Sequence, residues 1–199
     1  MADLTIARLL CARLCHDLGG VTGALTGAME LLDSAGAEAA EVARESAQAL
    51  QRRLLLWRAL ASGETVTRLG DVVALVDGQL AGGRATLDAA ALPGEAELPE
   101  GTGPVLLAAL LVAGEALPRG GTVRLLGGAE GMLAILPEGR NAAWPPALPA
   151  ALSAAGHEAS GPREILPVFL AIAAREAGLR LSLALGPGAG PPPLLIEPS

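Results

Sequence analysis

The chain contains no lysine, and all 14 of its basic residues are arginine. This absence excludes a glycine loop that holds a phosphate with a following lysine. Basic residues are also the minority, because the formal net charge is −7, and they form no cluster. Neither a nucleic acid nor an anionic membrane surface is therefore an expected partner.

Cysteine and histidine are scarce, with two of each in 199 residues. Cys11 and Cys15 stand four residues apart on one predicted helix, which is a poor geometry for a disulfide. We expect two reduced thiols, which fits a cytoplasmic location. The pattern Cys-x-x-x-Cys-His is one residue too long for covalent haem attachment and has too few ligands for structural zinc. The sequence thus predicts no metal or cofactor of its own.

Long hydrophobic runs are missing too. The most apolar run, residues 104–117, is too short to span a bilayer and contains Glu115. The N-terminus shows no signal pattern, so the sequence predicts no membrane association. Apolar residues nevertheless fill 51% of the positions. That is enough to build a core without metals or disulfides, in one medium domain or two small ones.

Hydrophobic periodicity predicts a first helix over residues 3–33. Its apolar residues recur at steps of three and four, as on one face of an α-helix. His16 lies two residues from both Leu14 and Leu18, so at roughly 100° per residue it is turned about 200° away from this stripe and should face water. The stripe consists of Ala7, Leu10, Leu14, Leu18, Val21, Leu25, Ala28 and Leu32.

The helix face around His16 carries small side chains, so a bulky partner can approach it closely. The nearest positions on that face are Ala12, Arg13, Gly19, Gly20 and Gly23. A glycine costs a helix about 1 kcal/mol relative to alanine. The glycines therefore indicate either that a partner must approach this face closely or that the gene's composition simply favours glycine and alanine codons. Beside the acidic Asp17, His16 is either a chemical group offered to a partner or an incidental surface histidine.

A second helix is predicted over residues 37–61, after a break at Ser34-Ala35-Gly36. The two helices form an antiparallel hairpin, and one hairpin alone cannot bury both apolar faces. Pairing with a second copy into a four-helix bundle solves this problem, so we expect a homodimer. The predicted apolar positions of the second helix are Ala43, Ala47, Leu50, Leu54, Trp57 and Ala61.

After Gly63 the sequence changes to short elements separated by glycine and proline. We predict helices over residues 69–80, 104–117, 146–154 and 162–177, and strands over residues 85–88, 122–126, 132–136, 180–185 and 194–197. The proline-rich stretches 143–149 and 186–193 are predicted connections. The fold class is therefore α+β, with a helical hairpin in residues 1–64 and a small α/β sandwich in residues 65–199.

Four segments carry a resemblance to a known family. They are residues 14–18 (Leu-Cys-His-Asp-Leu), 29–32 (Met-Glu-Leu-Leu), 57–63 (Trp-Arg-Ala-Leu-Ala-Ser-Gly) and 115–121 (Glu-Ala-Leu-Pro-Arg-Gly-Gly). In this order, on a hairpin and a small sandwich, they resemble the ChpT-type histidine phosphotransferases of alphaproteobacterial phosphorelays over nearly the whole chain. In that family the hairpin dimerises into a four-helix bundle, and the second domain resembles a histidine-kinase ATP-binding domain that has lost its nucleotide.

The sequence itself agrees with the loss of the nucleotide. The position of the magnesium-binding asparagine of the kinases corresponds to Val112, and the chain's one asparagine is Asn141, in a predicted loop. No Asp-x-Gly-x-Gly motif is present, and the glycine-rich run 186–190 has no acidic residue. Autophosphorylation from ATP is therefore not expected. Gly20 and Val21 replace the polar residue and proline that follow the histidine in kinases, which argues against a phosphatase-type side activity.

The resemblance implies a reaction at His16. Its imidazole takes a phosphoryl group from the aspartate of a hybrid-kinase receiver domain and passes it to the receiver aspartate of a response regulator. Imidazole, whose unperturbed pKa is about 6.5, is largely uncharged near neutral pH and suited to nucleophilic attack. Asp17 is expected to orient the imidazole or accept its proton, and the alternative is an ordinary solvated residue of the helix. Phosphoryl transfer depends mainly on positioning and charge neutralisation, so the Mg²⁺ is expected on the receiver.

The same resemblance suggests a docking surface for the receiver on the hairpin. Gly20, Gly23 and Thr26 lie below His16, with Arg58 of the second helix beside them, and dimer packing is the alternative use of these positions. Arg13 either contacts the phosphoryl group or a receiver acid, or forms an ordinary surface salt bridge.

Other functions stay open. A non-catalytic dimeric scaffold or inhibitor that binds receiver or kinase domains predicts the same fold. A small-molecule enzyme has less support, because no second histidine, paired carboxylates or phosphate loop accompany His16. His157 is predicted to be a surface residue without an identified charge partner, and Trp144 and Phe169 are predicted core residues.

Overall fold

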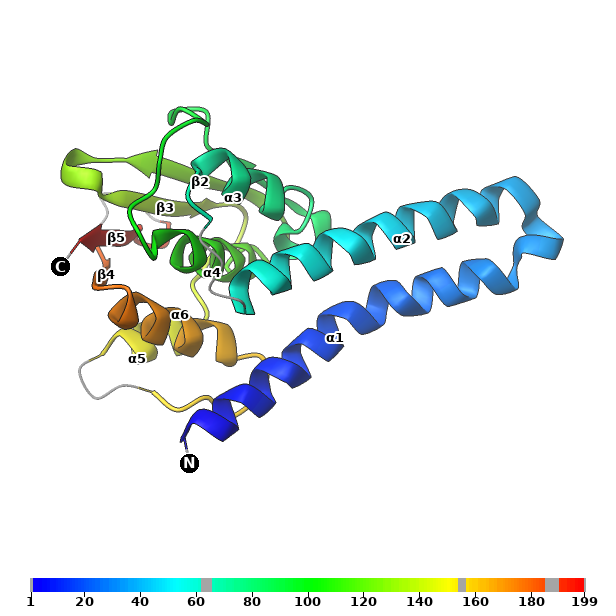
Figure 1. Cartoon of the computed structure of the whole chain (residues 1–199), viewed down its shortest axis with the longest axis horizontal. Coiled ribbons are helices and arrows are strands. Elements are labelled where there is room, and N and C mark those ends of the chain that lie inside the picture. Colours follow the sequence, from blue (N-terminus) through cyan, green and yellow to red (C-terminus); the bar gives the residue numbers. More distant parts are fainter. Residues whose placement is uncertain (1, 62–65, 154–156, 185–189, 199) are drawn as a thin grey trace.

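The computed structural model describes residues 2–61, 66–153, 157–184 and 190–198. It begins with two long helices, α1 (Ala2–Glu30) and α2 (Leu32–Ala61), which form the predicted antiparallel hairpin. The turn of this hairpin projects away from the rest of the molecule (Figure 1). No helix in the described ranges is long and apolar enough to cross a membrane.

The hairpin turns where predicted. Although α1 and α2 are divided at Leu31, a helical hydrogen bond from the N–H of Ala35 to the main-chain oxygen of Leu31 runs past this division. The break lies at Gly36, whose φ of 50° and ψ of −114° are not helical and whose left-handed φ costs glycine little because it has no Cβ. Asp17 and Arg53, which contact each other across the hairpin, are 36 positions apart and therefore equally far from the predicted break at residues 34–36.

The inward face of α1 is close to the prediction, whereas that of α2 is not. Val21 and Ala28 of α1 are buried, although Ala7 is exposed. On α2, Ala47, Leu54 and Ala61 are exposed. The residues buried there are Ala39, Ala43, Ser46, Leu56, Trp57, Ala59 and Leu60. The inward face changes because α2 packs on α1 along its length and also on α3 and α4 near its C-terminal end.

The remaining elements follow the predicted order with shifted ends. They are α3 (Leu69–Val76), η1 (Leu80–Gly83), β1 (Ala85–Asp88), α4 (Thr102–Glu115), β2 (Gly121–Gly127), η2 (Ala129–Gly131), β3 (Leu133–Glu138), α5 (Ala147–Leu152), α6 (Ile165–Glu176), β4 (Leu179–Leu183) and β5 (Leu194–Pro198). α3 is shorter than predicted because the chain leaves the helix before Gly78, which has φ 68°. Of the predicted connection 186–193, residues 186–189 lie outside the described residues.

The five strands form one mixed sheet in the order β1-β2-β3-β5-β4. β1 and β2 are parallel and the other neighbours are antiparallel. α4 and α6 pack together and lie on one side of this sheet (Figure 1). Alternate strand residues such as Val123, Leu125 and Ile135 are fully buried on the helix-covered face. The α+β class with a small sandwich is confirmed.

The hairpin and the sandwich share one hydrophobic core. Leu56, Trp57 and Leu60 of α2 belong to the same buried cluster as Leu106 and Leu107 of α4. This packing holds the C-terminal end of α2, with Leu10 and Leu14 of α1, against the sandwich, so residues on α1 can reach groups on α4. The division into domains at residues 64 and 65 stays a prediction, because residues 62–65 lie outside the described part of the chain.

Candidate functional site

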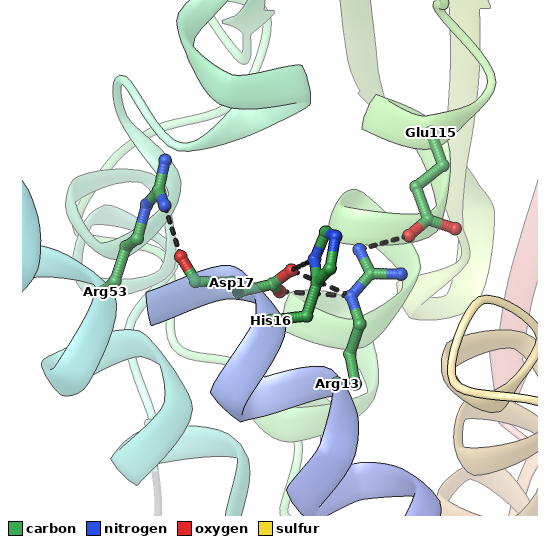
Figure 2. A network of polar contacts seen from close by, with 5 residues as sticks. All are labelled: Arg13, His16, Asp17, Arg53 and Glu115. Carbon is green, nitrogen blue, oxygen red and sulfur yellow. Dashed lines mark hydrogen bonds and ion pairs between the residues drawn. The ribbon is translucent and has the colours of Figure 1, made fainter. Parts of the chain in front are cut away.

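His16 lies in the middle of α1 and points into solvent, with 78% of its side chain exposed. It is exposed because its neighbours Leu14 and Leu18 turn toward α2. Its Nδ1 atom lies 3.3 Å from Oδ1 of Asp17. A carboxylate only accepts hydrogen bonds, so this contact favours the tautomer with the proton on Nδ1 and a free lone pair on Nε2. Figure 2 shows the second ring nitrogen directed away from Asp17.

Two arginines hold Asp17. Nε of Arg13, one turn earlier on α1, donates to both carboxylate oxygens of Asp17 at 3.0 and 3.1 Å. Arg53 reaches across from α2 and donates through Nη1 to the main-chain oxygen of Asp17 (Figure 2). The spacing of four residues makes the first contact possible within one helix, whereas the second depends on the packing of the hairpin.

The network continues into the sandwich through Glu115, the last residue of α4. Nη2 of Arg13 lies 2.5 Å from Oε1 of Glu115. Burial raises the pKa of Glu115, and Arg13 offsets this effect only in part. Burial alone would lower the pKa of Arg13, but Glu115 and Asp17 outweigh it, so the pKa of Arg13 is raised. Arg13 is therefore a fixed cation between two carboxylates.

A cavity of about 510 Å³ lies beside this network, between the hairpin and the sandwich. Its walls come from both parts of the chain, with Arg13, His16, Asp17, Arg53, Arg84 and Glu115 among the lining residues. His16 thus lies at a cavity lined by both charged and apolar side chains, which the sandwich helps to form.

The structure brings together some of the predicted site residues and separates others. Gly20 lines the same cavity as Arg13, His16 and Asp17. Three other predicted site residues are exposed on the hairpin but do not line this cavity, namely Gly23, Thr26 and Arg58. A Cβ atom added at Gly20 or Gly23 would meet nothing within 4 Å, so this side of α1 is open.

Arg13 has a partner that the sequence analysis did not identify. Its side chain is only 17% exposed and its guanidinium faces Asp17 and Glu115. A salt bridge was one of its two predicted uses, but Glu115 comes from α4 and could not be found among neighbours on the same helix. A contact of Arg13 with the phosphoryl group or a receiver acid stays a prediction.

Sequence reasoning assigned no role to Arg53 or Glu115. Glu115 had a signal, since it is the single charged residue in the apolar run 104–117. Arg53 had none, because it follows Arg52 in a helix that carries several arginines. Only the packing of α2 against α1 shows which of these arginines faces Asp17.

His157 has a charge partner after all. Its Nε2 atom lies 3.3 Å from Oε2 of Glu164, which also accepts hydrogen bonds from the main-chain N–H and the hydroxyl of Ser160. The Ser160 contacts lower the pKa of Glu164, and His157 adds to this effect. The prediction missed the pair because the residues lie seven positions apart in irregular chain. Trp144 and Phe169 pack against the core.

The described residues contain no cluster of side chains that could bind a metal ion. Cys11 and Cys15 are free and exposed, and among the described residues no three His, Cys, Asp or Glu side chains are grouped to hold a metal ion. Val112 is completely buried within α4. Asn141 lies in the loop after β3 with φ 60°.

Known proteins match this chain over most of its length. The family model for the histidine phosphotransferase C-terminal domain matches residues 69–188, more than half of the chain. The protein phosphotransferase ChpT of Brucella abortus (strain 2308) is 28% identical over 195 residues, which cover 92% of this chain and 91% of that protein. A solved structure of a bacterial phosphotransferase superposes with a TM-score of 0.75 at 27% identity, and the match covers 98% of this chain and 96% of that one. The fold, a long helical hairpin with an exposed histidine followed by a small sandwich, agrees with these matches. This chain belongs to the ChpT-type histidine phosphotransferases.

Proposed function

We propose that His16 accepts a phosphoryl group from the aspartate of a hybrid-kinase receiver domain and passes it to the receiver aspartate of a response regulator. The family supports histidine phosphotransfer in a phosphorelay. The observation that carries the choice of residue is the exposed imidazole whose Nδ1 lies 3.3 Å from the Asp17 carboxylate. This arrangement leaves Nε2 as an unhindered nucleophile.

The proposed chemistry uses two displacements at phosphorus. The Nε2 lone pair attacks the phosphorus of the receiver's aspartyl phosphate, the N–P bond forms, and the P–O bond to the aspartate breaks, so the carboxylate leaves. The Nδ1 proton stays on the ring, where Asp17 stabilises the positive charge. In the second transfer a carboxylate of the next receiver attacks, the N–P bond breaks, and the neutral imidazole is restored. Mg²⁺ on the receiver is expected to neutralise the phosphoryl oxygens.

ATP has no part in the proposed reaction. Val112 stands where the kinases carry their magnesium-binding asparagine, and it is apolar and completely buried. A buried valine has no oxygen with which to hold a metal-bound nucleotide. The phosphoryl group must therefore come from another protein.

The receiver is proposed to dock on the open side of α1 that Gly20, Gly23 and Thr26 form, with Arg58 of α2 at its edge. Small side chains allow the receiver's backbone to approach His16 closely. Arg13 lines the same cavity as His16 and Gly20, and its ion pairs with Asp17 and Glu115 hold it in place for the proposed contact with the phosphoryl group or a receiver acid.

The decisive experiment is phosphoryl transfer to the purified chain from a receiver domain labelled by its kinase, with ATP alone as the control. We expect acid-labile, base-stable label on the chain with the receiver and none with ATP. Failure to gain label from any receiver, with receiver binding intact, would favour a non-catalytic scaffold instead.

Replacing Gly20 by alanine is expected to stabilise the protein and to slow its reaction. The helix gains about 1 kcal/mol because alanine is the better helix former, and the new Cβ meets nothing within 4 Å in the free chain. In the docked complex, an overpacked contact costs about 1–3 kcal/mol. The half-saturating receiver concentration should therefore rise roughly fivefold or more.

Gly27→Ala tests how far along α1 the docking surface extends. It also meets nothing within 4 Å, and Gly27 follows Thr26, about 16 Å along the helix from His16 at 1.5 Å per residue. It should raise the melting temperature and affect transfer less than Gly20→Ala does. A Gly20→Ala protein that transfers as well as the wild type would remove Gly20 from the docking surface.

The proposed assembly is a homodimer through the hairpin. All six exposed large apolar side chains of the described residues lie there, namely Leu4, Met29, Leu31, Val42, Leu54 and Leu55. Leu54→Glu is expected to reduce the mass in light scattering from twice 19.9 kDa to one chain, because burying an unpaired charge opposes association. The control Ala90→Glu adds the same charge at an exposed position of the sandwich, outside the hairpin, and should stay dimeric. A wild-type mass of one chain would contradict the proposal.

A further inference from the structure

Glu115 occupies an unfavourable position that stability alone does not explain. It is the only charged residue of α4 and lies in the last turn of that helix. A negative charge at a helix C-terminus is disfavoured by the helix dipole, and burial, which raises the pKa of Glu115, disfavours it further. Oε1 of Glu115 is buried. Its countercharge is the Arg13 guanidinium, in ionic contact on α1.

The contact with Glu115 decides how Arg13 meets Asp17. A free arginine tends to bind a carboxylate with two nitrogens in a fork. Here Nη2 is held by Glu115, and Nε alone contacts the two oxygens of Asp17, at 3.0 and 3.1 Å. Oδ1 of Asp17 is therefore shared between Arg13 and Nδ1 of His16, which lies at 3.3 Å.

We infer that Glu115 is a positioning residue for the phosphotransfer reaction, acting through Arg13 and Asp17 on the tautomer and orientation of His16. The inference rests on the proposed function of His16. Glu115 holds Arg13 and Arg13 holds the Asp17 carboxylate. That carboxylate accepts a hydrogen bond from Nδ1–H of His16, so that Nε2 is the nitrogen presented to the receiver (Figure 2). The sandwich thereby takes part in the reaction without contacting the phosphoryl group.

The other charged residues near the site do not replace the connection from Glu115 through Arg13 to Asp17. Arg53 binds the main-chain oxygen of Asp17 and leaves its carboxylate to Arg13 and His16. Arg84 lines the same cavity from the segment between η1 and β1. Loss of the Glu115 charge is therefore expected to release Arg13, which can then turn both of its outer nitrogens toward Asp17 and compete with His16 for Oδ1.

The test is Glu115→Gln, which keeps the size of the side chain and removes its charge. Long-range ¹⁵N–¹H NMR correlations report the tautomer of His16, and His157 serves as an internal reference because the chain has two histidines. We expect the Nδ1-protonated fraction of His16 to fall, and the transfer rate at saturating receiver to fall roughly tenfold through lost orientation. The half-saturating receiver concentration should not change.

The control is Glu138→Gln, which removes a different arginine–glutamate pair of the sandwich, with Arg124. It should leave both the tautomer and the rate unchanged. Glu115→Asp, which keeps the charge, should recover part of the wild-type behaviour. Arg13→Gln removes the cation that shares Oδ1 of Asp17 with His16, so the Nδ1-protonated fraction should rise instead. Adding Glu115→Gln to that variant should then change the tautomer no further, and a further fall would show that Glu115 does not act through Arg13.

A Glu115→Gln protein with the wild-type tautomer would overturn the inference, and Glu115 would then be only a tether between the hairpin and the sandwich. A loss of transfer that appears only as a higher half-saturating concentration or as a smaller folded fraction would also overturn it. The tautomer is measured without any receiver. A wild-type chain that accepts no phosphoryl group therefore refutes the proposed function while leaving the role of Glu115 to be decided by NMR.

Discussion

Replacing His16 by alanine is expected to abolish phosphoryl transfer to the chain. The methyl group has no lone pair to attack phosphorus, and the other groups of the network, Asp17, Arg13 and Glu115, cannot substitute for it. A carboxylate would form a mixed anhydride of a different chemical stability, and an arginine is protonated and not nucleophilic. Label from a phosphorylated receiver should fall to background, which means a loss of at least about a thousandfold.

The fold of the variant should be intact, because the His16 side chain is 78% exposed and supports no packing. Its circular dichroism and melting temperature should match the wild type. His157→Ala is the matched control, since it removes the chain's other histidine, and it should accept label normally. If His16→Ala still gains acid-labile label, the phosphoryl group lies on another residue and the proposed site is wrong.

Replacing Trp57 by alanine is expected to cause the largest loss of stability among the substitutions considered. Trp57 is 8% exposed and belongs to the cluster that joins the end of α2 to the core of the sandwich. Removing a buried tryptophan side chain costs about 3–5 kcal/mol, because its transfer free energy is lost and a cavity remains. This is a large part of the 5–15 kcal/mol that typically holds a domain together. The measurement is urea unfolding at one protein concentration.

The remaining tryptophan, Trp144, can report unfolding in the variant, because it is partly buried and donates through Nε1 to the main-chain oxygen of Pro192 at 2.7 Å. Arg52→Ala is the matched control on the same helix, and it should change the free energy of unfolding by no more than about 0.5 kcal/mol because its side chain is exposed. A loss below about 1 kcal/mol for Trp57→Ala would show that the hairpin and the sandwich do not share a core.

Local patterns predicted much of this fold. The stripe through Leu14 and Leu18 placed His16 on the outer face of α1, because the helical period depends only on neighbours in the sequence. The order of the later helices and strands followed from the same kind of information. Their ends did not, and α3 is an example, since Gly78 left the helix shorter than its apolar pattern suggested.

The inward face of α2 could not be predicted from its own period. Leu54 continues the apolar repeat but is exposed, whereas Leu56 and Leu60 are buried. α2 packs against α1 and also against α3 and α4. The side of α2 that α3 and α4 cover depends on how residues later in the chain fold, so the period of α2 alone does not reveal it.

The sequence by itself determined that a hairpin presents one exposed histidine beside an acid, because exposure and adjacency are properties of a single helix. Only the tertiary structure decided that Arg13 faces Glu115 and that Arg53 faces the main-chain oxygen of Asp17. These contacts join residues that are far apart in the chain. Their free energy depends on distance and burial, and both quantities exist only after α2 and α4 have packed into one core.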